Sequence, residues 1–141
     1  MAGFTIFLGA NYTPQDLLNS SDDELRSLGL SRSKVSYVKA VAEAAGENAQ
    51  NFKDFHSLSN EEVLKILTDI RGIGVWSAQM FLMFQLRRQD VFAPGDLGLR
   101  KAMSLLYGYT MDGSDKIWEE RAEQWAPFRT LASLHLWKTL A

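Results

Sequence analysis

Apolar residues recur along this chain every three to four positions, and polar residues separate one such run from the next. This period indicates amphipathic helices, and no convincing run alternates with period two as a half-buried strand would. Two runs place their apolar side chains on one face, namely Val35, Val38, Ala42 and Ala45, and later Val63, Ile66, Leu67 and Ile70. The pattern predicts an all-α protein of about eight short helices, arranged as an orthogonal bundle because no heptad repeat persists.

Capping signals predict where the helices of the first half begin. Ser, Thr and Asp favour the position before a helix, and a Glu three residues later completes a capping box. The signals are Thr13-Pro14 for a helix to about Asn19, Ser21-x-x-Glu24, Ser31 or Ser33 for a helix to about Ala45, and Ser59-x-x-Glu62. Gly29 is expected to end the second of these helices. The polar stretch 46–56 is expected to be a loop.

The second half contains a more apolar run, "WSAQMFLMFQL", at 76–86. A helix that is apolar almost all round is expected in the centre of the core. After an irregular stretch, Asp96 stands where another helix begins. Asp112 or Ser114 is expected to cap a helix to Gln124, and Ala126-Pro127 precedes the last one.

Composition narrows the classes of protein that fit. With 141 residues, the chain is expected to form a single domain, 1–141. It contains no cysteine, which excludes disulfides and Cys-ligated metal sites and fits an intracellular chain. No apolar stretch reaches membrane-spanning length. His56 and His135 stand alone, so no side-chain metal site is expected. The net charge of -2 argues against a broad basic surface for nucleic acid.

The stretch "IRGIGVWSA" at 70–78 places two glycines between two helical patterns. Backbone N–H groups at such a turn can bind an anion, and a phosphate can approach closely where Cβ is missing. Gly72 is also a candidate for a positive φ angle. The alternative is a structural corner between two helices that binds no ligand. The glycine pattern alone leaves both interpretations open.

The surrounding segments resemble one family over 13–137. "LTDIRGIGVWSAQMF" resembles the helix-hairpin-helix of the DNA glycosylase superfamily, with Arg71 where proline is usual. "DVFAPGDLGLRKA" resembles the segment that carries the superfamily's catalytic aspartate, and "WAPFRTLASLHLW" the closing element of the alkylated-base (DNA-3-methyladenine glycosylase II) branch. "TPQDLL" and "SDDELRSLGLSRSKVSYVKAVAEA" match that branch too. The resemblance implies a helix-hairpin-helix fold and base-excision repair.

The resemblance also implies roles for particular residues. It makes Asp96 the catalytic carboxylate, although an Asp before a helix is commonly only a cap. Trp76 either borders the pocket for the flipped base or packs in the core. The expected DNA-binding residues are Arg71, Gly72, Ile73, Gly74 and Lys34. No lysine stands in 75–86, which argues against a Schiff-base lyase.

The implied function is therefore monofunctional hydrolysis of the N-glycosidic bond of alkylated purines, 3-methyladenine and 7-methylguanine. Base flipping would deliver the base, and an abasic site would remain. The expected partner is double-stranded DNA with alkylated bases, bound by a monomer in the bacterial cytoplasm or a nucleus, with no membrane. No cofactor is required, although relatives suggest Na⁺ or K⁺ at the backbone carbonyls of Ile70 and Ile73.

Members of this branch usually have further helices before the "TP" element, and this chain has twelve residues there. We therefore expect a shortened glycosylase domain, either active or inactive. The alternatives are a non-catalytic helix-hairpin-helix DNA-binding module and a helical interaction domain without a nucleic-acid role. Most other basic residues are expected to be solvated, and Trp118, Trp125, Phe128 and Trp137 to pack in the core.

Overall fold

A computed structural model describes residues 11–47 and 52–141. Within these ranges the backbone forms helices, turns and irregular segments but no strand, which confirms the all-α prediction. The chain divides into two compact units, Met1–Gly74 and Val75–Ala141, and each is described by itself. A single domain over 1–141 stays a prediction.

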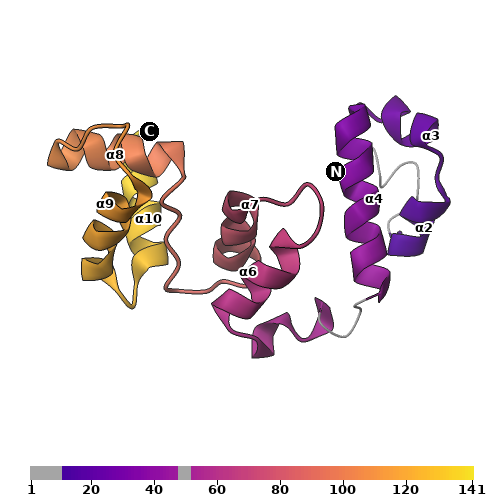
Figure 1. The fold of residues 1–141 in the computed structure, drawn as a ribbon, viewed down its shortest axis with the longest axis horizontal. Helices are drawn as coiled ribbons and strands as arrows, with labels where there is room; N and C mark the ends of the chain where they lie inside the picture. Colours follow the sequence, from indigo (N-terminus) through magenta and orange to yellow (C-terminus); the bar gives the residue numbers. More distant parts are fainter. Residues whose placement is uncertain (1–10, 48–51) are drawn as a thin grey trace. The chain divides into compact units, whose positions relative to one another are not determined.

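Residues 11–47 of the first unit form three helices: α2 (Pro14–Asn19), α3 (Asp22–Ser27) and α4 (Arg32–Glu47). The two short helices lie beside α4 (Figure 1), and Leu25 and Val35 are buried where α3 meets it. The predicted caps are confirmed at Thr13, which forms a capping box with Asp16, and at Ser21. Local hydrogen bonds therefore determine where these helices begin.

The first unit continues through a 3-10 turn, η1 (Phe55–Ser57), into α6 (Asn60–Thr68). Ser59 caps α6 as predicted, and Val63 and Leu67 are buried. The predicted loop 46–56 is wrong at both ends, because α4 continues to Glu47 and a helical segment includes Phe52. Phe55 in the C-terminal part of this stretch is buried. The middle of it, 48–51, lies outside the described residues.

The second unit begins with α7 (Val75–Met80), which continues as a π-helical segment, η2 (Phe81–Gln85). The expectation that this run is buried all round is wrong. Its buried residues are Ala78, Leu82, Met83 and Leu86. Val75, Trp76 and Phe84 each expose more than half of their surface. The prediction failed because an apolar sequence does not state which of its faces will find a packing partner.

The remaining elements are α8 (Leu97–Tyr107), α9 (Asp115–Ala122), a 3-10 turn η3 (Glu123–Trp125) and α10 (Arg129–Lys138). Helix α10 packs against α8 (Figure 1), and Trp118 of α9 is completely buried, as predicted. Gly108 ends α8 in the left-handed conformation. Of the two candidates for the start of α9, Ser114 occupies the N-cap position.

Candidate functional site

Asp96 is a buried carboxylate at the N-terminus of α8, with 7% of its surface exposed. Its Oδ1 accepts hydrogen bonds from the backbone N–H of Leu99 (2.8 Å) and from Nε1 of Trp137 (3.0 Å). Its Oδ2 accepts one from Nε1 of Trp76 at 2.6 Å. A carboxylate offers about four lone-pair sites, so three donors fix its orientation and leave one site on Oδ2. The cap and the indoles together hold this anion in place.

Trp76 contacts the carboxylate and is also exposed. Its indole N–H is directed at Asp96, yet 51% of its surface is exposed. The interpretation of Trp76 as a core residue is therefore wrong. The first turn of α7 holds the polar edge of the ring on the carboxylate while much of the ring remains accessible.

Trp137 is the contact of Asp96 that sequence reasoning missed, because it was assigned to core packing. It is half-buried, and its ring stacks on Phe84 with the centroids 5.9 Å apart. Gly98 makes room for it, since a Cβ on Gly98 would lie 3.0 Å from the indole and 3.1 Å from Asp96 Oδ1. No local pattern indicates a contact between residues so far apart in sequence.

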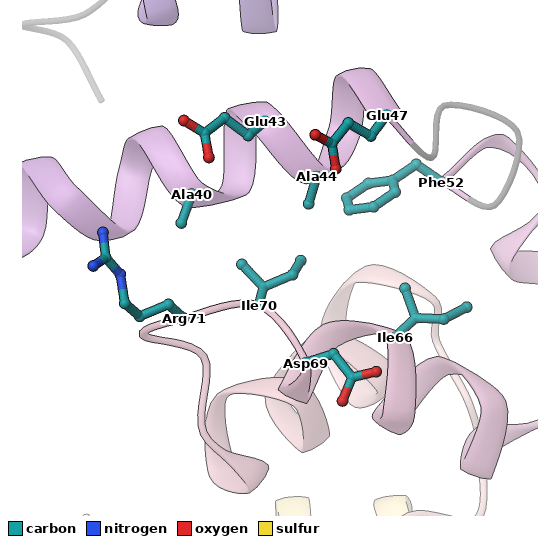
Figure 2. A pocket seen from close by; sticks show the side chains of 9 residues that line it. All are labelled: Ala40, Glu43, Ala44, Glu47, Phe52, Ile66, Asp69, Ile70 and Arg71. Carbon is teal, nitrogen blue, oxygen red and sulfur yellow. The ribbon is translucent and has the colours of Figure 1, made fainter.

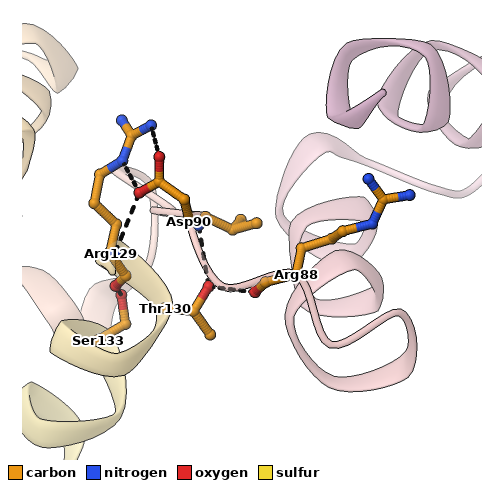
Figure 3. Close-up of polar contacts among 6 residues, drawn as sticks. Arg88, Asp90, Arg129, Thr130 and Ser133 are labelled. Carbon is orange, nitrogen blue, oxygen red and sulfur yellow. Dashed lines mark hydrogen bonds and ion pairs between the residues drawn. The ribbon is translucent and has the colours of Figure 1, made fainter. Parts of the chain in front are cut away.

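The irregular segment before Asp96 is attached to the start of α10 (Figure 3). The guanidinium of Arg129 donates from Nε to Asp90 Oδ1 (2.7 Å) and from Nη2 to Oδ2 (2.9 Å). Asp90 and Arg129 therefore form an ion pair that ties this segment to α10. The side-chain hydrogen bond from Arg129 lowers the pKa of Asp90, and the same bond raises the pKa of Arg129.

Thr130 adds three hydrogen bonds to the same segment. Its hydroxyl donates to the carbonyl of Arg88 (2.6 Å) and accepts from the N–H of Val91 (3.0 Å). Its own N–H donates to the carbonyl of Gln89 at 2.9 Å. We call Arg129 and Thr130, with their partners in 88–91, the α10 clamp.

Arg100 supports the other end of this segment. The sequence placed most basic residues on solvated surface, but the Arg100 side chain is only 16% exposed. It donates from Nε to the carbonyl of Pro94 (2.6 Å) and forms an ion pair with Asp115. Arg100 therefore holds the turn that leads into Asp96. Phe128 also differs from its prediction, because 54% of it is exposed.

The glycine turn belongs to the first unit, and its two glycines have different surroundings. Gly72 has a φ of +94°, as the sequence suggested, and a Cβ there would lie 2.3 Å from the ring of Tyr37. Tyr37 comes from α4, so a close helix contact requires this glycine. A Cβ on Gly74 would meet no atom within 4 Å. Space beside Gly74 is therefore open to a ligand.

The other residues predicted to bind DNA lie around the same turn. Arg71 donates from Nη2 to the hydroxyl of Ser36 on α4 and remains exposed. Lys34 is exposed in the first turn of α4, one turn before Tyr37. Residues three apart lie on the same helix face, so Lys34 is on the side of α4 that contacts the turn. Ile73 donates its N–H to the carbonyl of Ile70 (3.1 Å).

A pocket of about 530 Å³ lies between α4 and α6 of the first unit (Figure 2). Its apolar lining includes Ile66 and Ile70. Its charged lining consists of three carboxylates and one guanidinium: Glu43, Glu47, Asp69 and Arg71. With three carboxylates against one guanidinium, the lining carries a net negative charge, which disfavours a phosphate. The pocket therefore does not fit a DNA-backbone site.

Residues 11–47 and 52–141 contain neither a group of metal ligands nor a membrane-spanning helix. In these ranges no three His, Asp or Glu side chains are grouped to hold a metal ion. No helix there combines the length and the apolar character that crossing a membrane requires.

Comparisons with known proteins agree with the geometry. Residues 3–128 match the model of the HhH-GPD superfamily base excision DNA repair protein. The chain is 35% identical over 128 residues to DNA-3-methyladenine glycosylase 1 of Schizosaccharomyces pombe, covering 90% of this chain and 56% of that protein.

Two solved structures share the fold. A Bacillus halodurans DNA-3-methyladenine glycosidase superimposes with a TM-score of 0.84 at 36% identity, covering 97% of this chain and 64% of that one. The S. pombe 3-methyladenine DNA glycosylase in complex with abasic DNA gives 0.81 at 32% identity, covering 98% and 70% respectively. This chain belongs to the HhH-GPD superfamily of base excision DNA repair proteins.

Proposed function

We propose that this protein is a monofunctional DNA glycosylase that hydrolyses the N-glycosidic bond of alkylated purines, such as 3-methyladenine and 7-methylguanine. The observation that carries the proposal is the Asp96 carboxylate, which is buried and oriented by two indoles and a helix N-terminus. The names of similar proteins support the substrate class.

Asp96 has the chemistry that this reaction needs. Breaking an N-glycosidic bond develops positive charge on the sugar, and a fixed anion stabilises that charge or orients the attacking water. The remaining lone-pair site of Oδ2 is where such an interaction would form. Alkylated purines carry positive charge and leave readily, so the site needs little acid catalysis.

Trp76 is proposed to stack on the flipped base. Aromatic rings attract electron-poor or cationic ring systems, and half of this side chain is accessible. Its hydrogen bond to Asp96 would place the base beside the carboxylate. The lack of lysine in 75–86 leaves no nucleophile there for a Schiff base, which favours direct hydrolysis.

Double-stranded DNA is the proposed partner, with the glycine turn on its backbone. Gly74 offers open space to a phosphate, while Arg71 and Lys34 supply positive charge around the turn. The carbonyls of Ile70 and Ile73 are oxygen ligands suited to Na⁺ or K⁺, and the Ile70 carbonyl keeps a second lone pair after accepting the Ile73 N–H. Such an ion would hold the turn's shape.

The test is release of free methylated purine from N-methylated duplex DNA, with strand cleavage only after alkali treatment of the abasic sites. Borohydride added during the reaction is expected to trap no covalent complex. A trapped complex would contradict monofunctional hydrolysis, and absence of base release would favour the second candidate.

The second candidate is a non-catalytic helix-hairpin-helix module or an inactive relative. One observation favours it, because Asp96 caps α8 through the Leu99 N–H and has a structural role without any chemistry. In that case methylated DNA would be bound but no base released.

A further inference from the structure

We propose that the α10 clamp positions the Asp96 carboxylate, with Thr130 as the principal positioning residue. The expected effect on the rate of base release rests on the proposed function, whereas the expected effect on the position of Asp96 does not. All of the residues involved belong to the second unit.

Helix α10 holds the segment that carries Asp96 at two places. Its first turn fixes 88–91 through the clamp (Figure 3), and Trp137 near its end fixes the carboxylate itself. Thr130 and Trp137 are seven residues apart, or roughly 10 Å along the helix. The intervening segment is thus attached to one rigid element at both ends.

The segment between these attachments has little freedom of its own. Val91, Phe92 and Ala93 are all buried, and the N–H of Asp96 donates to the carbonyl of Ala93 (3.0 Å). A displacement of 88–91 along α10 would therefore be transmitted to Asp96. The distance most sensitive to it is the one from Trp137 Nε1 to Asp96 Oδ1.

Thr130 is central because one hydroxyl connects two residues of the segment, and 8% of Thr130 is exposed. Valine has almost the same shape but neither donates nor accepts. Thr130→Val would leave the Arg88 carbonyl and the Val91 N–H without this partner, in a site with little access to water. The segment would then shift to recover these hydrogen bonds.

The experiment compares Thr130→Val with Thr130→Ser, which keeps the hydroxyl. Ser133→Ala is the matched control, because the completely buried Ser133 hydroxyl donates its hydrogen bond to the Arg129 carbonyl within the same helix, not to the segment. The first readout is the Trp137 indole N–H resonance in a ¹H–¹⁵N spectrum. Four indole signals are expected, and Trp137→Phe assigns the relevant one.

The second readout is the single-turnover rate of methylpurine release, beside affinity for abasic-site DNA. We expect Thr130→Val to move the Trp137 signal and to slow release about tenfold or more, with abasic-DNA affinity changed less than twofold. Thr130→Ser should restore both readouts, and Ser133→Ala should leave both unchanged.

An unmoved Trp137 signal in a folded Thr130→Val protein would overturn the proposal. If that variant does not fold, Asp90→Asn replaces it, because it weakens the Arg129 half of the clamp and retains the Thr130 hydroxyl. If the parent protein releases no base, the proposed function fails while the indole signal still decides whether the clamp positions Asp96.

Discussion

Trp137 donates its indole N–H to Asp96 Oδ1 over 3.0 Å, although the two residues are 41 positions apart. The last helix of the chain thereby completes the hydrogen bonding of the carboxylate at the start of α8. Its ring also packs on Phe84, so packing and orientation depend on the same side chain.

Trp137→Phe should separate these two roles. Phenylalanine keeps an aromatic ring against Phe84 but removes the donor to Asp96. We expect the single-turnover rate of base release to fall about tenfold, because a misplaced catalytic group loses much of its effect. Trp125→Phe is the control, since Trp125 contacts Phe92 and Tyr107 and donates no hydrogen bond to Asp96. An equal loss of rate in both variants would contradict the assignment of Trp137 as the residue that orients Asp96.

The two glycines of the turn should respond differently to substitution. Gly72→Ala adds a Cβ where φ is +94° and Tyr37 occupies the space, so we expect destabilisation of about 1–3 kcal/mol or more. Gly74→Ala meets no atom and should change the free energy of unfolding little. Urea denaturation measures both. A larger loss for Gly74→Ala than for Gly72→Ala would contradict this account of the turn.

Gly74→Val tests the ligand side of the turn. The bulkier side chain would occupy the open space, and we expect weaker binding to duplexes of every sequence, because phosphate contacts carry no base information. Fluorescence anisotropy with several abasic-site duplexes measures this effect. An unchanged affinity for these duplexes would show that the glycine turn does not contact the DNA backbone.

Lys34→Ala should reduce the salt dependence of DNA binding. Each phosphate contact that is lost lowers the slope of log K against log salt by about 1. Lys116→Ala is a suitable control, because the Lys116 side chain is 81% exposed and lies within α9. If both variants change the slope equally, the assignment of Lys34 as a DNA-phosphate contact is wrong.

The ion pair of Asp90 and Arg129 should make stability depend on acid pH. The hydrogen bond from Arg129 lowers the pKa of Asp90 in the folded protein below its ordinary value of 3.8. The contribution is therefore complete above that value and disappears as the pH falls through the lowered folded pKa. Both side chains are about one third exposed, so screening limits the contribution to roughly 1 kcal/mol.

Comparing the parent with Asp90→Asn checks this dependence. The difference between their free energies of unfolding should be constant from about pH 7 to pH 5 and shrink below about pH 4. A difference that shrinks near neutral pH, or that persists unchanged to pH 2, would show that Asp90 is not the titrating group.

Local signals predicted the helix starts well, because a capping box involves residues only three positions apart. Thr13, Ser21 and Ser59 show this, and Asp96 was correctly placed before α8. The contacts of the site were harder to predict. Trp137 with Asp96, and Tyr37 with Gly72, depend on how distant elements pack, and no periodic pattern encodes that.

The apolar run that begins in α7 shows why burial is hard to predict from a sequence pattern. Its composition indicates burial, yet Trp76 and Phe84 are more than half exposed. A hydrophobic pattern reports which residues could be buried, and only tertiary packing determines which of them are. The exposed indole is nevertheless what makes Trp76 a candidate for stacking on a base.

The measurement that tests the central claim most directly is methylpurine release by the parent and by Asp96→Asn. Asparagine caps a helix about as well as aspartate, so α8 should persist while the negative charge is lost. Asp112→Asn, which changes an exposed acid of the same unit, is the control. We predict that Asp96→Asn abolishes release while abasic-DNA binding survives and the control keeps full activity. Equal release by the parent and Asp96→Asn would contradict the account.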